Sequence, residues 1–139
     1  MEIKPPVPVI PILLNTYYPP NVPTAARCHD IGRALREAIA ASPTACRVAV
    51  IASGGLSHFI VDEALDARVI AGFAPDHAHL LRDLPRGALM SGSSEILNWV
   101  LTAGAVDHLP LDWIDYVPLR RTPAGTGVGA AFAVWAEAI

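Results

Sequence analysis

Residues 48–58 read VAVIASGGLSH, and this stretch decides the predicted fold of the chain. Residues 47–52 are almost entirely apolar and rich in β-branched side chains, a pattern typical of a short strand buried on both faces. Gly54 and Gly55 then allow a tight loop, and His58 follows it. In open α/β sheets, functional side chains gather in the crevice at the carboxyl ends of strands. The stretch therefore predicts a buried strand, a tight loop and a histidine that faces such a crevice.

Helical and strand-like patterns alternate on both sides of this stretch. Thr24 is the predicted N-cap of a helix that ends near Pro43. The apolar positions of this helix are Ile31, Ala34, Leu35, Ala38 and Ile39. Further helices are expected over residues 62–71, 75–84 and 91–103, and extended segments over residues 7–14, 113–119 and 130–135. Gly104 is expected just past the end of the helix before it. The alternation predicts an α/β fold with a partly parallel sheet flanked by helices, in a single domain over residues 1–139.

The composition favours a soluble globular protein. The chain has 139 residues, of which 53% are hydrophobic and 17% charged, which is too apolar for intrinsic disorder. A formal net charge of −3 disfavours binding to nucleic acid or to an anionic membrane. The proline-interrupted N-terminus does not resemble a secretory signal. Cys28 and Cys46 lie in no metal-binding spacing, are expected to be small buried hydrophobes, and fit a reducing cytoplasm.

Two residues are candidates for chemistry, and each has a structural alternative. His58 either works in the predicted crevice or merely forms a hydrogen bond across its loop, and spacing alone does not decide between these roles. Glu95 lies in SGSSEILNW, residues 91–99, at the start of a predicted helix. There a carboxylate either caps the helix and benefits from its dipole, or serves as a hard oxygen ligand for Fe(II) or another divalent ion.

The remaining polar motifs carry weaker signals. His77 and His79 follow a helix start and are expected to be solvated, His29 is expected on a wet face of the first helix, and His108 has no identifiable partner. The glycine-rich residues 124–129, AGTGVG, lack the spacing and the lysine of a phosphate-binding loop.

Four blocks in this order resemble the class III extradiol ring-cleavage dioxygenases, specifically the catalytic (beta) subunit type of protocatechuate 4,5-dioxygenase and gallate dioxygenase. The blocks are NTYYPPNVPTAARCHDIGRAL at 15–35, VAVIASGGLSHFIVDEALD at 48–66, SGSSEILNWVLTAGA at 91–105 and DYVPLRRTPAGTGVGAAFAVW at 115–135. The resemblance covers nearly the whole chain and implies the C-terminal half of that fold.

The resemblance also implies roles for individual residues. His58 matches the family's second-sphere acid/base and Glu95 its Fe(II) carboxylate ligand, while Thr122 or Thr126 would contact a substrate carboxylate. The implied reaction is extradiol (meta) cleavage of a catechol-type aromatic acid with Fe(II) and O₂. Neutral His58 would accept a phenolic proton and later return one, a task suited to a histidine.

The sequence departs from the family at the metal ligands. In the family, two histidine ligands precede the block that resembles residues 15–21, and this chain has no counterpart of them. A facial triad requires two histidines and one carboxylate. We therefore expect a complementary N-terminal half or a small subunit to complete the site, and a homo-oligomer that covers the exposed face. The alternatives are an inactive relative that binds an aromatic acid or a partner protein, and a rebuilt metal site that uses His29, His77, His79 or His108.

Overall fold

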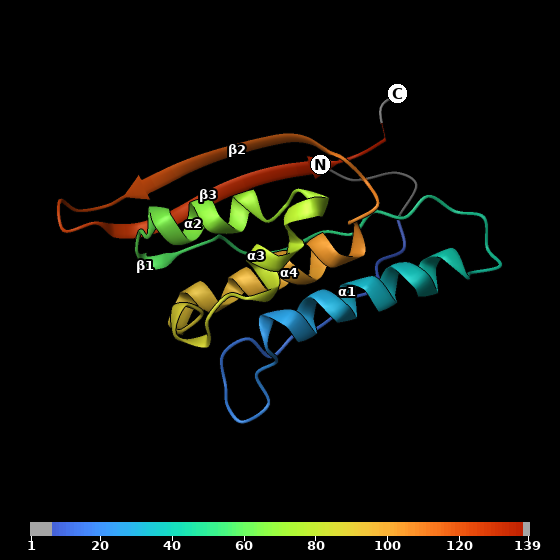
Figure 1. The fold of residues 1–139 in the computed structure, drawn as a ribbon, viewed down its shortest axis with the longest axis horizontal. Helices are drawn as coiled ribbons and strands as arrows, with labels where there is room; N and C mark the ends of the chain where they lie inside the picture. The colour runs from blue at the N-terminus through green and yellow to red at the C-terminus, as the bar shows by residue number, and fades with distance from the viewer. Residues whose placement is uncertain (1–6, 138–139) are drawn as a thin grey trace.

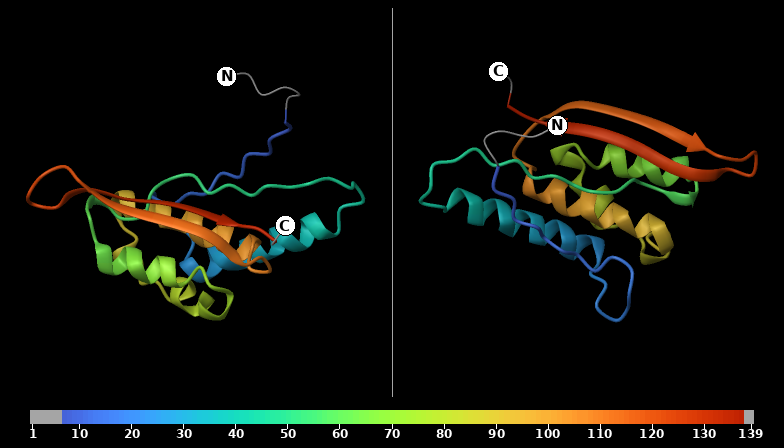
Figure 2. Two further views of the ribbon diagram at one scale, coloured as in Figure 1. Left: turned by 90° about the horizontal axis from the view of Figure 1, so that it is seen from above. Right: turned by 180° about the vertical axis from the view of Figure 1, so that it is seen from behind.

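The computed structural model describes residues 7–137, which form a three-stranded antiparallel sheet and a set of helices. The helices are α1 (Ala25–Ala40), α2 (Glu63–Ala71), α3 (Ala78–Arg82) and α4 (Ile96–Ala105), with short 3-10 turns at Pro75–His77, Arg86–Ala88 and Ser91–Glu95. The strands are β1 (His58–Ile60), β2 (Leu111–Arg120) and β3 (Thr126–Trp135), in the spatial order β1-β3-β2. The long β2–β3 hairpin forms one layer, α2 and α4 lie beneath it, and α1 lies on the far side of α4 (Figures 1 and 2). The predicted α/β class is confirmed.

The N-cap predicted at Thr24 is confirmed, and α2 also begins with a side-chain cap. The Thr24 hydroxyl accepts a hydrogen bond from the amide of Arg27, and the Asp62 carboxylate accepts one from the amide of Leu65, so both helices begin with a side-chain cap. The buried face of α1 differs from the predicted one. Its fully buried residues are Ala25, Cys28, His29 and Gly32. The larger predicted positions, Ile31 and Leu35, pack only at the edge of the core.

Gly104 does not end a helix, contrary to the prediction. It lies inside α4 and is buried against α1. A Cβ atom at Gly104 would stand 2.2 Å from the backbone oxygen of His29, and one at Gly32 would stand 2.0 Å from the backbone oxygen of Leu101. The two helix backbones therefore touch where both side chains are single hydrogens. Position 104 therefore needs a glycine because the two helices approach closely there, and not because the helix ends at this residue.

The predicted strand over residues 47–52 does not form, and residues 7–14 are extended without strand pairing. The described residues, 7–137, contain only antiparallel pairs, so the parallel part of the predicted sheet is not found in them. A strand buried on both faces needs pairing partners in a sheet, and no strand within residues 7–137 pairs with residues 47–52. As a result Ile51 is 84% exposed and Ile10 87% exposed.

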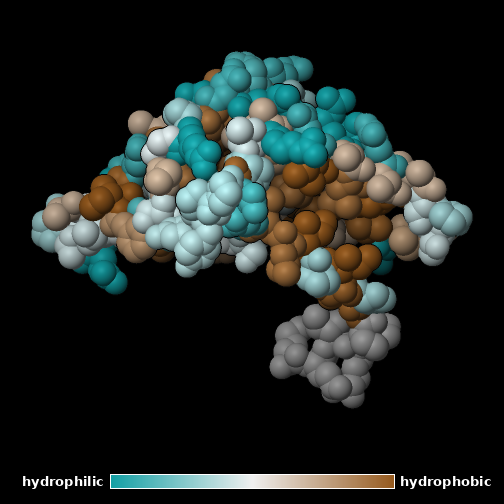
Figure 3. Space-filling model, turned by 90° about the horizontal axis from the view of Figure 1, so that it is seen from below, coloured by the Kyte–Doolittle hydropathy of each residue, from teal (hydrophilic) through white to brown (hydrophobic). Residues whose placement is uncertain are grey.

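These two segments leave an open apolar face, defined here by Val7, Val9, Ile10, Ile12, Leu13, Val48 and Ile51. Apolar surface gathers beside the point where the described chain begins (Figure 3). A soluble monomer rarely exposes this much contiguous apolar surface, and such patches mark interaction sites. Within residues 7–137, no helix has the length and apolar character needed to cross a membrane.

The environments of two further residues differ from the predictions. Cys28 is buried as expected, and burial raises the pKa of its thiol to about 11, but Cys46 is exposed. His29 was expected on a wet face, yet it is only 4% exposed, and its ring Nδ1 lies 3.4 Å from Nη1 of Arg82 on α3. Burial, followed by the positive charge of Arg82, lowers the pKa of His29.

The lowered pKa of His29 predicts a loss of stability in mild acid. The unfolded chain takes up a proton near pH 6.5, whereas the folded chain does so only at lower pH, so protonation favours unfolding. The free energy of unfolding should therefore fall as the pH drops below about 6.5, by at most about 1.4 kcal/mol per pH unit from this group. Urea midpoints at about pH 7.5 and about pH 5.5 measure the effect. His29→Gln should reduce the difference between the two midpoints, whereas His77→Gln, at an exposed histidine, should not; equal differences in both variants would contradict the assignment.

Candidate functional site

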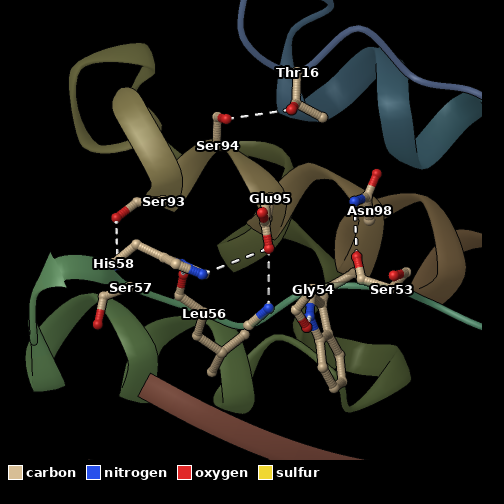
Figure 4. A network of polar contacts seen from close by, with 12 residues as sticks. Thr16, Ser53, Gly54, Leu56, Ser57, His58, Ser93, Ser94, Glu95 and Asn98 are labelled. Carbon is tan, nitrogen blue, oxygen red and sulfur yellow. Dashed lines mark hydrogen bonds and ion pairs between the residues drawn. The ribbon is translucent and has the colours of Figure 1, made fainter. Parts of the chain in front are cut away.

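His58 and Glu95, which are 37 positions apart in the sequence, converge in the structure. His58 opens β1, Glu95 ends the 3-10 turn before α4, and the imidazole Nε2 lies 3.6 Å from Oε2 of Glu95. Figure 4 shows the ring of His58 directed toward this carboxylate. The side chains are 24% and 43% exposed, so a small molecule or ion can reach both groups.

The capping interpretation of Glu95 does not hold. Its side chain makes no capping hydrogen bond to α4. Instead Oε2 accepts a hydrogen bond of 3.2 Å from the amide of Gly55, in the loop that carries His58. Gly54 makes this contact possible, because its φ of +117° lies in the region that favours glycine and a Cβ there would stand 2.4 Å from Oε2. The carboxylate therefore bonds to the loop that carries His58 and makes no capping bond at the start of α4.

The hydrogen bonds of His58 define which ring nitrogen is available. The Nδ1 atom lies 2.8 Å from the carbonyl oxygen of Leu56. Because a carbonyl oxygen only accepts, Nδ1 carries the proton and donates it in this contact. In the neutral ring, the lone pair then lies on Nε2, the nitrogen that faces Glu95. The two sequence interpretations of His58 are thus compatible: one nitrogen bonds across the loop and the other is available for chemistry.

Residues 91–99 hold the His58 loop along its length. The Ser93 hydroxyl accepts a hydrogen bond of 2.9 Å from the amide of His58. The side chains of Asn98 and Trp99 donate to the carbonyl oxygens of Ser53 and Gly54 at 2.8 and 2.9 Å. The two sequence blocks that carry His58 and Glu95 therefore form one structural unit (Figure 4).

The backbone is strained directly after His58. Phe59 has a φ of +65°, a conformation that is costly for a bulky residue and that persists only where its surroundings impose it. Its side chain is 66% exposed, so packing of the ring is not the reason. Strain of this kind concentrates at functional sites, where it directs a neighbouring side chain.

The predicted substrate contacts lie at the turn of the hairpin, with Thr122 in the turn itself and Thr126 at the start of β3, the strand that pairs with β1. Thr122 and Thr126 hydrogen-bond to each other through their hydroxyl groups at 2.7 Å. Thr126 pairs with Ile60, two residues beyond His58, so it lies on the same strand ladder as the candidate base. Their role toward a substrate remains a prediction.

The other histidines do not join this site. His29 is buried beside Arg82, while His77, His79 and His108 are exposed, as expected for His77 and His79. In the part of the chain that the structure describes, no group of three or more His, Cys, Asp or Glu side chains is placed to hold a metal ion. A metal site rebuilt from these histidines is therefore not observed there.

Sequence reasoning missed Asp66. This residue is 0% exposed and contacts Ser57, next to His58. A signal was present, since Asp66, Val69 and Phe73 have helical spacing and all three are buried, which places the carboxylate on the inward face of α2.

An oriented imidazole beside an accessible carboxylate is an arrangement that proteins use in metal-assisted and in acid–base chemistry. The chain belongs to the family described as the catalytic LigB subunit of aromatic ring-opening dioxygenase, which matches residues 1–115. It is also 31% identical over 111 residues to gallate dioxygenase of Pseudomonas putida, across 73% of this chain and 32% of that protein. The chain thus spans about a third of the length of this relative. The resemblance to a class III extradiol catalytic subunit is confirmed.

Proposed function

We propose that this chain carries the carboxylate and the acid/base of an extradiol dioxygenase site that cleaves a catechol-type aromatic acid with Fe(II) and O₂. The observation that supports this most is the 3.6 Å approach of His58 Nε2 to Glu95 Oε2, because these are the two residues to which the motif resemblance gives the roles of acid/base and carboxylate ligand. The gallate dioxygenase relative, named for its action on an aromatic acid, supports the substrate class.

Glu95 is the proposed iron ligand from this chain. A carboxylate oxygen suits Fe(II), and this one retains lone pairs beyond the single hydrogen bond from Gly55. The described residues supply this carboxylate but no cluster of three ligands, so the remaining ligands are proposed to come from elsewhere. When bound, the iron would act as a Lewis acid toward the substrate hydroxyls and offer a position for O₂.

His58 is the proposed proton acceptor. Its Nε2 lone pair would take a proton from a substrate hydroxyl and later return one, which is general base and then general acid catalysis. The bond from Nδ1 to the Leu56 carbonyl keeps the ring in the tautomer that this role needs. The hydrogen bond from the backbone amide of His58 to the Ser93 hydroxyl keeps the backbone in place while the proton moves.

The two histidine ligands are proposed to come from another polypeptide segment. The open apolar face supports this view, because segments with Ile10 and Ile51 almost fully exposed are ready to pack against further structure. The chain's 32% coverage of gallate dioxygenase is consistent with a site that needs more protein than this chain contains. The occupant of the face is proposed to be a complementary N-terminal half or a small subunit, and a second copy of the chain when that segment is lacking.

Metal analysis and mixing test this proposal. The purified chain alone is expected to sediment as an oligomer, to bind less than one equivalent of iron and to cleave no catechol. Mixed or coexpressed with a family N-terminal segment that carries two histidines, it should bind iron and consume O₂ with a protocatechuate or gallate substrate. Stoichiometric iron and turnover in the isolated chain would contradict the need for a partner. A completed complex that binds an aromatic acid without turnover would instead support the inactive-relative alternative.

A further inference from the structure

We propose that Asp66 is a positioning residue for His58 and that it acts through the peptide bond between Leu56 and Ser57. The inference rests on the proposed function insofar as it gives His58 a catalytic role. The effect of the Asp66 carboxylate on the orientation of the His58 ring can itself be tested without measuring turnover.

Asp66 is a wholly buried carboxylate that is satisfied by neutral donors. Its Oδ1 accepts a hydrogen bond of 2.8 Å from the amide of Ser57. Its Oδ2 accepts bonds of 2.7 Å from the hydroxyl of Ser57 and 2.7 Å from the hydroxyl of Tyr116 on β2. Burial, together with the bond to Asp66, raises the pKa of Tyr116, so its hydroxyl remains a donor. A buried carboxylate is costly unless it is hydrogen-bonded in this way, so its position is closely determined.

The Leu56–Ser57 peptide transmits that position to His58. The amide N–H of Ser57 and the carbonyl of Leu56 belong to one planar peptide group and point in opposite directions. Asp66 holds the N–H end at 2.8 Å, and Nδ1 of His58 donates to the carbonyl end at 2.8 Å. The carboxylate therefore fixes the plane that orients the imidazole. A charge-assisted bond to the N–H also polarises the carbonyl and makes it a stronger acceptor.

The backbone around this peptide has its own supports, which separates positioning from folding. The amide of Leu56 donates to the carbonyl of Gly129 on β3, and the amide of Gly129 donates to the carbonyl of Ser57, both at 2.8 Å. These bonds hold the loop against the sheet without Asp66. Loss of the carboxylate would therefore free the orientation of one peptide plane while the strand pairing remains.

The test reads the tautomer of His58 by nitrogen NMR of a chain labelled in its histidine rings. Five histidines give few signals, and those of His58 are identified by their loss in His58→Gln. In the unaltered chain at a pH where the rings are neutral, Nδ1 of His58 should show a protonated signal and Nε2 a bare one. Asp66→Asn offers only one acceptor oxygen to the same donors, so the two signals should shift toward each other as both tautomers become populated.

Three control variants separate positioning from a general loss of stability. Ser57→Ala removes the hydrogen bond from the hydroxyl of residue 57 to Asp66 but keeps the hydrogen bond from its backbone amide. The tautomer of His58 should therefore persist even if the urea midpoint falls. Tyr116→Phe should likewise preserve the tautomer. Asp76→Asn, at an exposed aspartate, should change neither the tautomer nor the midpoint.

A folded Asp66→Asn chain with an unchanged His58 tautomer would overturn the inference. If that variant does not fold, hydrogen exchange in the unaltered chain tests the inference instead. The Ser57 amide should then exchange much more slowly than the exposed loop amides. Rapid exchange of the Ser57 amide would also overturn the inference. In the completed dioxygenase, Asp66→Asn should lower kcat by about tenfold to a hundredfold with little change in KM, the range for groups that orient another residue. Full turnover in His58→Gln would defeat the proposed function but leave the tautomer result standing.

Discussion

Glu95→Ala is expected to remove the iron from the completed dioxygenase, whereas His58→Ala is expected to leave the iron bound and abolish turnover. The reason is that the proposed function gives different roles to these two residues, whose side chains lie 3.6 Å apart. Glu95 offers a hard anionic oxygen, and its loss leaves the ion without its only carboxylate from this chain. His58 offers a lone pair on Nε2 for proton transfer, and general acid–base catalysis contributes about 10² to 10⁴ in rate.

Iron content per chain and kcat, measured on the same preparations, check this separation. His58→Ala should keep the iron of the unaltered complex with kcat lower by at least about 10²-fold. Glu95→Ala should lose both iron and activity, and Glu37→Ala, at an exposed glutamate on α1, should lose neither. Equal loss of iron in the two site variants would show that the assigned roles are wrong.

Gly104→Ala is expected to cause a large loss of stability. The added Cβ would lie 2.2 Å from the backbone oxygen of His29, and a backbone atom cannot rotate away as a flexible side chain can. The helices α1 and α4 would have to separate, at a cost near or above the upper end of the about 1–3 kcal/mol typical of overpacked cores. Since α1 packs mainly against α4, and otherwise against α3, separation of α1 from α4 should weaken the fold as a whole.

Urea unfolding measures the effect of the added methyl group. Gly104→Ala should lower the midpoint at unchanged slope. The matched control is Gly87→Ala, because nothing lies within 4 Å of a Cβ at that glycine. The free energy of unfolding of Gly87→Ala should stay within about 0.5 kcal/mol of that of the unaltered chain. Equal midpoints for the two variants would show that the helix crossing adapts without cost.

The candidate site was partly predictable because its two sequence blocks contain the necessary chemistry. His58 follows a glycine pair and Glu95 begins a helix, and both signals are local. Their meeting was not predictable from spacing, since a carboxylate at a helix start is equally well explained as a cap. The structure separated the two explanations: Glu95 accepts from the amide of Gly55 and makes no bond to the end of its own helix.

Errors in the predicted fold arose where a local pattern had a non-local cause. Gly104 has the pattern of a residue that ends a helix, but it lies inside α4. A glycine is needed there because the backbone of α1 occupies the space that a side chain would fill. Residues 47–52 have the composition of a buried strand, yet they form no strand and Ile51 is 84% exposed, because no strand of the described chain pairs with them. Asp66 was missed although it shares its helical spacing with the apolar Val69 and Phe73, because that spacing does not show what the carboxylate contacts.

The amino-acid sequence by itself determined the helix starts at Thr24 and Asp62, the extended hairpin strands and the chemistry available at His58 and Glu95. These depend on interactions within a few residues, such as a hydroxyl or carboxylate that accepts from an amide three positions on. Only the tertiary structure decided that Glu95 faces Nε2 and that Asp66 holds the peptide to which Nδ1 donates. These contacts join segments whose relative positions are set by packing of the whole chain, and packing depends on which surfaces fit together and not on any local pattern.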